Sequence, residues 1–303
     1  MSTPHAGDRP SSTTFLVGLI GSGIGPSLSP ALHEREAEEL GLHYLYRRLD
    51  LDVLGLGAES VGELLAAARL AGYDGVNITH PCKQLAVPHL DDLSPDAAQL
   101  NAVNTVVFAG GRSVGHNTDW SGFARSFDWG LADAALDHVV LLGAGGAGSA
   151  VAHALLTLGA GRLDIMDVDR DRATSVAESL CERFGADRAR GRAVAELGNA
   201  LTGADGLVHA TPTGMAAHPG LPLPAELLDT RLWVADIVYR PLETALVRTA
   251  RSLGCRVLDG GGMAVFQAVD SFRLFTGIDP DPSRMLAHFE TLVDEPGLDR
   301  HVG

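Results

Sequence analysis

The sequence has few of the residues that mark several large classes of protein. Lysine occurs once among 23 basic residues, and cysteine occurs three times, without a spacing that suits a metal ion. This small, odd number of cysteines predicts free thiols in a reducing compartment. No apolar run approaches the length of a membrane span. Positive charge is also scarce, because 38 acidic residues give a formal net charge of -15, which argues against nucleic acid and anionic membranes as partners.

We therefore expect a cytoplasmic protein, monomeric or homodimeric, whose ligand is a small molecule. The apolar residues 15–20 are too few for the core of a signal peptide, and they run into glycines instead of a cleavage site. Residues 1–13 are rich in Ser, Thr, Pro and Gly and are predicted to form a disordered tail. No pair among the twelve histidines has metal-ligand spacing, so no metal is predicted.

The single lysine, Lys83, is the first candidate for chemistry. Arginine is effectively always charged, whereas a partly desolvated lysine shifts its pKa and can exchange a proton near neutral pH. Lys83 follows the β-prone residues 76–79 and Pro81, which suits the first turn of a helix. This places Lys83 at the carboxyl end of a strand, the edge where open α/β sheets bind ligands. Replacement of surface lysines by arginine, with one chance survivor, explains the scarcity but not the position.

Alternating strand-like and helix-like segments predict an α/β protein. A chain of 303 residues exceeds what one hydrophobic core usually serves, so two domains are expected. In the first half, strands are expected at 15–20, 44–49 and 76–79, and helices near Pro30 and over 61–70, an order that predicts a mainly parallel sheet. A hairpin over 103–108 and 113–116 would close that sheet.

A second series of strands begins near His138. Strands are expected at 139–142, 163–166, 206–210 and 233–238 and near Val257, with helices at 150–158 and 172–184. This order predicts a Rossmann-type, doubly wound domain over 119–259. The helical stretches 263–276 and 283–293 are expected to return to the first domain, which then comprises 14–118 plus 260–303.

A glycine-rich loop lies at the start of the second domain. Gly143-x-Gly145-x-x-Gly148 follows a predicted strand and opens a predicted helix, and Asp167 stands nineteen residues beyond the last glycine. In that context the glycines permit a tight turn, a close backbone approach to a pyrophosphate, and close packing of helix on strand. A strand-to-helix turn that binds nothing is the weaker alternative. We expect a dinucleotide on residues 143–148.

Asp167 bears on which dinucleotide is bound. A carboxylate at the end of this strand can accept hydrogen bonds from both hydroxyls of the adenosine ribose, whereas a 2'-phosphate would meet the like charges of Asp167 and Asp169. This favours NAD over NADP. Arg170 and Arg172 are the counter-argument, because the side chain of either can reach a phosphate, but a solvated position at the start of a helix is preferred for both.

Eight segments together resemble one known family, the shikimate dehydrogenases, and within it the quinate/shikimate dehydrogenase branch. The resemblance covers nearly the whole chain after residue 14. The segments are Ser-Leu-Ser-Pro at 27–30 with His33, Asn-Ile-Thr-His-Pro-Cys-Lys at 77–83, Ala-Val-Asn-Thr at 102–105, Gly-His-Asn-Thr-Asp-x-x-Gly at 115–122, the glycine loop at 143–148, Ala-Thr-Pro-Thr-Gly-Met at 210–215, Asp-Ile-Val-Tyr-x-Pro at 236–241, and Gly-x-x-Met-x-x-x-Gln at 260–267.

The resemblance implies a role for each matching position. Lys83 and Asp119 would form the catalytic pair beside the hydroxyl that is oxidised, and the first domain would bind the substrate. The substrate carboxylate would be held by Ser27, Ser29 and Tyr239, and the ring hydroxyls by Thr79, Asn104 and Gln267. The cofactor would be held by Gly143, Ala144, Gly145, Gly146, Ala147, Gly148, Asp167 and Val238, with Thr211, Met215, Gly260 and Met263 around the nicotinamide.

Elementary chemistry supports these roles and also offers alternatives. A hydride leaves a carbinol carbon only as the hydroxyl proton leaves, so a base must lie within hydrogen-bond reach, and we expect Lys83 and Asp119 to titrate as a coupled pair. Asp119 is equally suited to cap a helix, and Ser27 and Ser29 to begin one. Gln267 lies in an apolar stretch, where a buried amide needs partners that substrate hydroxyls would supply.

Three positions depart from the family's pattern. NADP-using members typically place Asn-Arg-Thr where this chain has Asp-Val-Asp at 167–169, and quinate-active members often carry Thr at the position of Ser29. His209 replaces the usual Asn. The predicted function is therefore NAD-dependent, reversible oxidation of the ring hydroxyl of shikimate or quinate. The alternatives are an NADP-dependent biosynthetic enzyme, a dehydrogenase for an amino- or otherwise modified ring acid, and a non-catalytic dinucleotide sensor.

Overall fold

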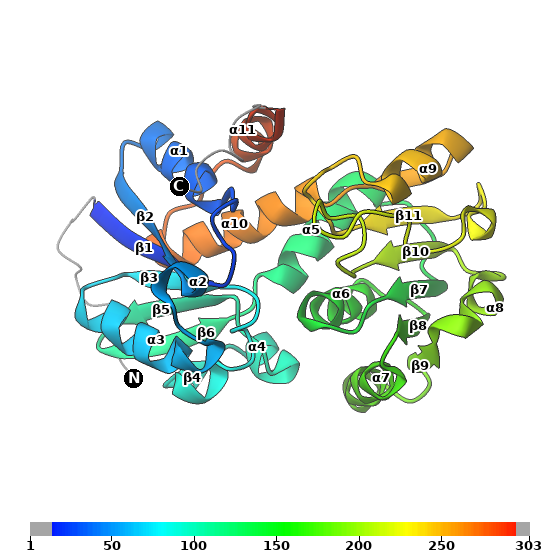
Figure 1. The fold of residues 1–303 in the computed structure, drawn as a ribbon, viewed down its shortest axis with the longest axis horizontal. Coiled ribbons are helices and arrows are strands. Elements are labelled where there is room, and N and C mark those ends of the chain that lie inside the picture. The colour runs from blue at the N-terminus through cyan, green and yellow to red at the C-terminus, as the bar shows by residue number, and fades with distance from the viewer. Residues whose placement is uncertain (1–13, 295–303) are drawn as a thin grey trace, which may run out of the picture.

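The computed structural model describes residues 14–294 and contains two six-stranded sheets that lie side by side (Figure 1). The first sheet has the order β2-β1-β3-β5-β6-β4. Its strands are β1 (Thr14–Gly21), β2 (His43–Asp50), β3 (Gly75–Ile78), β4 (Asp92–Leu93), β5 (Thr105–Ala109) and β6 (Arg112–His116). β1 pairs in parallel with β2 and β3, and β5 and β6 form the predicted antiparallel hairpin. The hairpin does not close the sheet, because the short β4 adds in parallel to β6.

Both faces of the first sheet are buried, which explains the continuous apolar run of β1. Alternate residues of a strand point to opposite faces. Ile20 packs on one face with Val61 and Leu65 of α3, whereas Val17 packs on the other with Phe272 of α10. The helices of this half of the chain are α1 (Ser29–Glu39), α2 (Leu51–Leu54), α3 (Val61–Leu70) and α4 (Pro95–Leu100), with 3₁₀ turns η1 (Ala58–Ser60) and η2 (Val87–His89).

The helix that we predicted after Pro81 is absent, and this prediction was wrong. The His80–Pro81 peptide bond is cis, and residues 79–86 form successive turns. The reason is a tertiary hydrogen bond: the Lys83 carbonyl accepts from the N–H of Val103 at 2.9 Å, so it is not available for the next helical turn. Lys83 is thereby fixed to the segment that leads into β5.

The second sheet is entirely parallel and has the order β12-β11-β10-β7-β8-β9. Its strands are β7 (His138–Leu142), β8 (Arg162–Asp167), β9 (Ala189–Ala193), β10 (Gly206–His209), β11 (Trp233–Asp236) and β12 (Arg256–Leu258). The chain proceeds outward from β7 in one direction and then in the other, so the strand order reverses between β7 and β10. Such a reversal is where doubly wound sheets bind ligands.

Helices cover both faces of the second sheet and produce two buried cores. They are α6 (Gly146–Thr157), α7 (Arg170–Phe184), α8 (Leu197–Leu201) and α9 (Ala245–Leu253), with 3₁₀ turns η3 (Val194–Glu196) and η4 (Ala225–Leu227). Val139 and Leu141 of β7 belong to one core, and Val140 and Leu142 to the other. This parallel, doubly covered sheet is the predicted Rossmann-type architecture.

Three further helices complete the described fold: α5 (Asp119–Leu131), α10 (Gly261–Thr276) and α11 (Pro282–Asp294). α5 and α10 pack together in the region between the sheets, and α10 extends to β1 and β5 of the first sheet (Figure 1). Arg284 of α11 forms an ion pair with the buried Glu36 of α1 at 2.5 Å. The C-terminal helices thus return to the first sheet, as predicted. Residues 1–13, where we expected a tail, lie outside the described residues.

Within residues 14–294, no helix combines the length and the apolar character needed to cross a membrane.

Candidate active site

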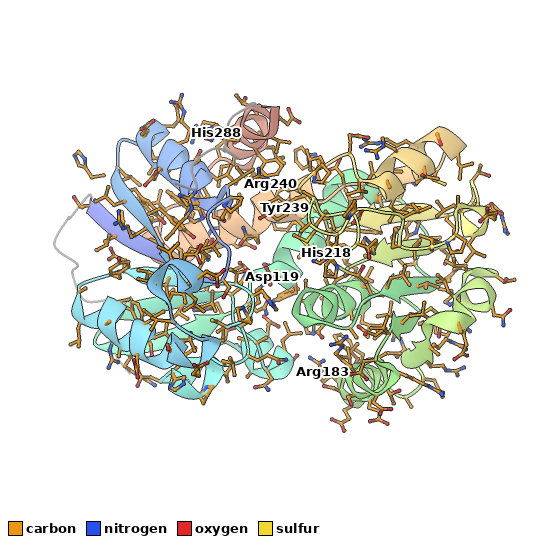
Figure 2. The ribbon with its side chains drawn as sticks, in the orientation of Figure 1. Asp119, Arg183, His218, Tyr239, Arg240 and His288 are labelled. Atoms are coloured by element: carbon orange, nitrogen blue, oxygen red, sulfur yellow. The ribbon has the colours of Figure 1, made fainter. Side chains whose placement is uncertain are left out.

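The structure brings together Lys83 and Asp119, which the sequence places 36 positions apart. Lys83 Nζ lies 2.5 Å from Asp119 Oδ2, and the two side chains are only 20% and 10% exposed. Asp119 is the first residue of α5 and lies in the region between the two sheets (Figure 2). Thr118 occupies the N-cap position and Asn117 Oδ1 accepts the N–H of Asp119, so the Asp119 carboxylate does not cap the helix. It is directed instead to the lysine.

Asn104 holds the second oxygen of this carboxylate. Its Nδ2 donates to Asp119 Oδ1 and to Thr118 Oγ1, each at 2.9 Å, and its Oδ1 accepts the N–H of Thr118 at 2.7 Å. Both hydrogens of the amide are therefore committed to the start of α5. The contact between Asn104 and a ring hydroxyl stays a prediction. In the structure, Asn104 holds the carboxylate of Asp119 in place.

Behind Asn104 lies a buried chain of hydrogen bonds that the sequence did not suggest. The Tyr46 hydroxyl donates to Asn77 Oδ1 at 2.6 Å, Asn77 Nδ2 donates to Thr105 Oγ1 at 3.0 Å, and Thr105 Oγ1 donates to Asn104 Oδ1 at 3.1 Å. Burial raises the pKa of Tyr46, so its hydroxyl keeps its proton as a donor. The chain crosses β2, β3 and β5 and ends at the Lys83–Asp119 pair.

The predicted carboxylate-binding residues come from two segments. Ser27 and Ser29 flank Leu28, which is the N-cap residue of α1, and Ser27 Oγ accepts the N–H of Ser29 at 3.3 Å. Tyr239 lies beyond β11, and burial raises the pKa of its hydroxyl. The next residue, Arg240, donates to the carbonyl of Pro26. This contact joins the segment that contains Tyr239 and Arg240 (Figure 2) to the serine loop, so the two predicted parts of the carboxylate site are linked.

Thr79 and Gln267 are both half-buried. Thr79 follows β3 and donates its N–H to the carbonyl of Ile20 at 2.9 Å. Gln267 lies on α10, where its Nε2 donates to the carbonyl of Ala264 at 2.9 Å. Gly122, one turn after Asp119, lets α5 approach α10 closely, because an added Cβ would lie 2.7 Å from the backbone nitrogen of Gln267. Gln267 thus lies where α10 packs against α5, one turn after Asp119, but it is less buried than we expected.

The glycine loop has the shape of a dinucleotide cradle. Gly143 has a φ of +106°, and a Cβ on it would lie 2.4 Å from the carbonyl oxygen of Ala210. A Cβ on Gly148 would lie 2.1 Å from the carbonyl oxygen of Gly143, whereas Gly145, the N-cap of α6, faces open space. The backbone N–H groups at the start of α6 are therefore exposed to an anion, as a pyrophosphate site requires. These residues fit a bound dinucleotide.

The Lys83–Asp119 pair lies beside this loop. A Cβ placed on Gly146 would lie 4.0 Å from Cδ of Lys83, which is ordinary van der Waals contact. The lysine from the first sheet therefore reaches the first turn of α6 in the second half of the molecule. A ligand held by the glycine loop would lie beside the Lys83 side chain.

Asp167 ends β8 and already accepts three hydrogen bonds. Its Oδ2 accepts the N–H of Ala144 at 2.8 Å, and its Oδ1 accepts from Arg172 and from the N–H of Asp169, at 2.5 Å and 2.9 Å. Burial raises the pKa of Asp167, but these three hydrogen bonds outweigh it and leave the pKa below its usual value. Arg172 is therefore an ion-pair partner of Asp167 and not the purely solvated charge that we preferred.

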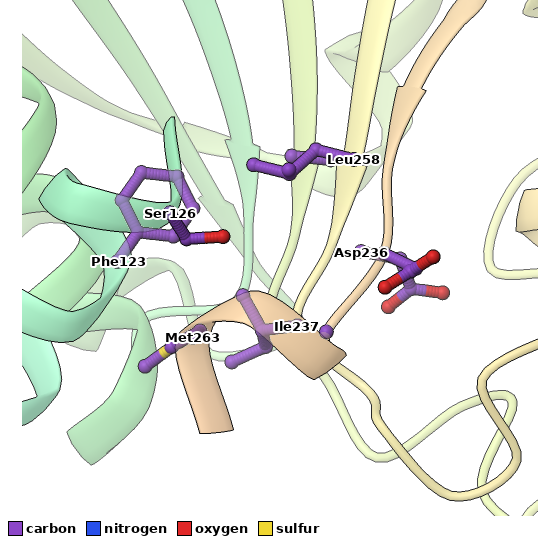
Figure 3. A pocket seen from close by; sticks show the side chains of 9 residues that line it. Phe123, Ser126, Asp236, Ile237, Leu258 and Met263 are labelled. Atoms are coloured by element: carbon purple, nitrogen blue, oxygen red, sulfur yellow. The ribbon is translucent and has the colours of Figure 1, made fainter. Parts of the chain in front are cut away.

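The remaining cofactor candidates lie in two segments, the loop that follows β10 and the start of α10. Thr211 Cγ2 lies 3.2 Å from a Cβ placed on Gly143, and Met215 is 43% exposed. Gly260 cannot carry a side chain, because an added Cβ would lie 2.6 Å from the carbonyl oxygens of both Ile237 and Val238. Met263 is buried and lines a small pocket with Ile237, Gly260 and six other residues, which come from α5, β11, β12 and the turn between β12 and α10 (Figure 3).

Comparisons with known proteins agree with this arrangement. The family model for the shikimate dehydrogenase substrate binding domain matches residues 19–106. A shikimate dehydrogenase (NADP(+)) of Streptomyces avermitilis is 66% identical over 280 residues, covering 92% of this chain and 96% of that protein. A quinate/shikimate dehydrogenase (NAD(+)) of Corynebacterium efficiens is 48% identical over 280 residues, covering 92% and 99%. The solved structure of quinate dehydrogenase from Corynebacterium glutamicum in complex with NAD superposes with a TM-score of 0.87 at 46% identity, covering 92% and 99%.

Proposed function

The chain belongs to the shikimate dehydrogenase family of NAD(P)-dependent oxidoreductases acting on CH–OH groups, and we propose that it oxidises the ring hydroxyl of shikimate or quinate reversibly to the 3-dehydro ketone, with NAD as the preferred cofactor. The observation that carries the proposal is the position of Lys83, which contacts Asp119 and lies beside the edge of the glycine loop. One amine thus stands where a substrate hydroxyl and a dinucleotide would meet.

Lys83 is proposed as the group that moves the proton. When bound, the nicotinamide ring supplies the acceptor for the hydride. The neutral Lys83 amine takes the hydroxyl proton as the carbon–hydrogen bond breaks, and in the reverse direction the ammonium returns a proton to the developing alkoxide. Asp119 orients the amine through its 2.5 Å contact, and Asn104 holds the other oxygen of Asp119.

Recognition of the ring acid is proposed for two groups of residues. Ser27, Ser29 and Tyr239 would hold the carboxylate, and the Arg240 contact with Pro26 supports their acting together. Thr79 and Gln267 would hold ring hydroxyls. Asn104 would provide a third contact while it keeps its hydrogen bond to Asp119. An amino-substituted ring acid would fit the same side chains, so the substrate must be identified by assay.

The proposed preference for NAD rests on Asp167. Its carboxylate lies beside the glycine loop, where a ribose hydroxyl would find an acceptor and a 2'-phosphate would meet negative charge. NADP is the second candidate, because Arg172 lies on Asp167 and the 66%-identical relative is named for NADP(+). We also propose that residues 14–118 with 260–303 form the substrate-binding unit, and that 119–259 form the cofactor-binding unit.

A steady-state screen of NAD and NADP against shikimate and quinate tests this function. We expect reduced cofactor to accumulate with at least one ring acid, and kcat/KM to be higher with NAD than with NADP. A clear preference for NADP would contradict the assignment of Asp167 and leave the proposed chemistry intact. Cofactor binding without turnover of either acid, or of an amino-substituted analogue, would favour a dinucleotide sensor instead.

A further inference from the structure

A buried histidine–aspartate pair lies at the carboxyl edge of the second sheet and has no part in the chemistry proposed above. His209, the last residue of β10, is 0% exposed, and Asp236, the last residue of β11, is 1% exposed. His209 Nδ1 lies 2.9 Å from Asp236 Oδ1. Burying two ionisable groups is unfavourable unless each is fully hydrogen-bonded, so the partners of this pair indicate what it holds.

Each remaining polar atom of the pair is bonded to a neighbouring segment. His209 Nε2 lies 2.6 Å from Thr211 Oγ1, and Asp236 Oδ2 accepts the hydroxyl of Thr244 at 2.7 Å. Asp236 Oδ1 also accepts the N–H of Val238 at 3.1 Å. Because a carboxylate oxygen can only accept, His209 Nδ1 donates to Asp236 Oδ1, and His209 Nε2 is left to share a hydrogen bond with the Thr211 hydroxyl. The chain runs from Thr211 through His209 and Asp236 to Thr244.

Both ends of this chain touch the loop that follows β10. Thr211 lies against Gly143 of the glycine loop, and its Oγ1 also accepts the N–H of Thr213 at 3.3 Å. Thr244, the N-cap of α9, has its Cβ 3.4 Å from a Cβ placed on Gly214, whose φ is +98°. Residues 211–214 are thus held between the glycine loop and α9.

We propose that His209 is a positioning residue for the cofactor, acting through the hydroxyl of Thr211 to hold residues 211–215 against the glycine loop. This inference rests on the proposed function, and on the family resemblance that places Thr211 and Met215 around the nicotinamide. A loop fixed before the ligand arrives does not have to be ordered on binding, so its contacts contribute fully to affinity and to the alignment of the ring.

The chemistry of the side chain explains why histidine suits this position. The two imidazole nitrogens lie on opposite sides of a rigid ring, so one can hold the carboxylate while the other holds the hydroxyl. Asparagine places its amide where Nδ1 lies and can retain Asp236, but it is too short to reach Thr211 as well. Substitution of His209 by Asn therefore cuts the chain at one defined bond.

Binding of reduced cofactor to the full chain, without ring acid, provides the test. Dissociation constants for NADH and NADPH would be measured by fluorescence titration for the wild type, Thr211→Val, Thr211→Ser and His209→Asn. Loss of the hydroxyl in Thr211→Val, or of Nε2 in His209→Asn, should weaken binding of the preferred cofactor roughly 3-fold to 10-fold, the value of one hydrogen bond. Thr211→Ser should bind within about 2-fold of wild type.

Two further comparisons separate positioning from general stability. The double variant His209→Asn/Thr211→Val should bind no more weakly than the worse single variant, because both changes break the same chain. Thr202→Val is the control, since Thr202 is exposed and its hydroxyl bonds only to the carbonyl of Gly198 among the described residues; it should bind as wild type. Melting temperatures would be recorded for all variants.

Wild-type affinity in both Thr211→Val and His209→Asn, with only a lowered melting temperature, would overturn the inference and leave the chain a purely structural role. If His209→Asn does not fold, Thr211→Val decides alone, because it keeps the His209–Asp236 pair. A wild-type protein that binds neither NADH nor NADPH would contradict the proposed function itself, and that result is visible before any variant is compared.

Discussion

Lys83 Nζ and Asp119 Oδ2 lie 2.5 Å apart although the two residues belong to different elements, a turn after β3 and the first position of α5. Each is held by its own backbone: the Lys83 carbonyl by Val103, and the Asp119 N–H by Asn117. The backbone positions of both residues therefore bring the pair together, and the contact does not depend only on the conformation of the long lysine side chain. The position of Lys83 beside Gly146 places the proposed proton-transfer group next to the glycine loop.

The Asp167–Arg172 ion pair predicts how cofactor preference should respond to mutation. Asp167→Asn removes the charge that opposes a 2'-phosphate and frees Arg172 to meet it. We expect the ratio of kcat/KM for NAD over that for NADP to fall by roughly 10-fold or more, because one close charge–charge contact changes sign.

Arg172→Ala provides the matched change for this prediction. It removes only the cation, so activity with NAD should stay within about 3-fold of wild type while activity with NADP falls. Arg190, which is exposed and pairs with Asp187, is the control arginine. An unaltered cofactor ratio in Asp167→Asn would contradict the role assigned to this carboxylate.

The chain from Tyr46 to Asn104 predicts that a distant hydroxyl supports the active site. Tyr46→Phe leaves the buried Asn77 Oδ1 without its 2.6 Å donor. We expect the free energy of unfolding to fall by roughly 1–3 kcal/mol, as for other buried groups left unpaired. Urea unfolding measures this, and kcat should fall more than KM rises because Asn104 and Asp119 lose support.

Tyr73→Phe is the control for Tyr46. Tyr73 is also partly buried, but its hydroxyl has no hydrogen bond that the structure shows among residues 14–294. Its removal should change the free energy of unfolding by less than about 0.5 kcal/mol. Equal effects of the two substitutions would show that the hydrogen bond to Asn77 contributes nothing specific.

A buried histidine in the first half predicts acid sensitivity. Burial lowers the pKa of His33 to about 3, from an ordinary value of 6.5, and its neutral ring bonds to the Tyr44 hydroxyl at 3.0 Å. The unfolded chain therefore binds a proton below pH 6.5 that the folded protein does not. His33 contributes full stability above pH 6.5, and that contribution is lost as the pH falls toward 3, at up to about 1.4 kcal/mol per pH unit.

The prediction for His33 is tested by measuring the free energy of unfolding between pH 6 and pH 4 and comparing its slope against pH in the wild type and in variants. His33→Gln should have a slope shallower than wild type by about 1.4 kcal/mol per pH unit, whatever its stability at neutral pH. His43→Gln, at an exposed position on β2, should keep the wild-type slope. Identical slopes in His33→Gln and wild type would mean that His33 gains a proton in the folded state as readily as in the unfolded chain.

The sequence predicted the architecture well because its signals are local. Apolar runs such as 139–142 and the glycines at 143–148 define a strand and the turn that follows it without reference to the rest of the chain. The helix expected after Pro81 failed because a distant residue, Val103, takes the Lys83 carbonyl. The strand β4 was missed because two residues carry no periodicity.

The hydrogen-bond networks of the site could not be predicted in this way. Tyr46 of β2 contacts Asn77 of β3 across β1, which lies between these two strands in the sheet although it precedes both in the sequence. The contact therefore depends on the strand order and register of the whole sheet. For His209 the sequence showed a departure from the family but not its meaning, which appears only when Asp236 and Thr211 are placed around the ring.

The single side-chain amine permits a chemical test of the site. An amine-directed acylating reagent can modify only Lys83 among the side chains. Loss of activity should follow modification of Lys83 in one-to-one proportion, measured by peptide mass spectrometry, and bound ring acid should slow both. Complete modification with full activity would contradict a role for this amine.

The most direct test of the account is the turnover number of Lys83→Ala, measured with the better ring acid and the better cofactor. Folding would be verified by circular dichroism and by the dissociation constant for reduced cofactor. If Lys83 moves the proton, kcat should fall by roughly 10²-fold to 10⁴-fold while cofactor binding changes little. A folded variant whose kcat equals that of the wild type would contradict the central claim.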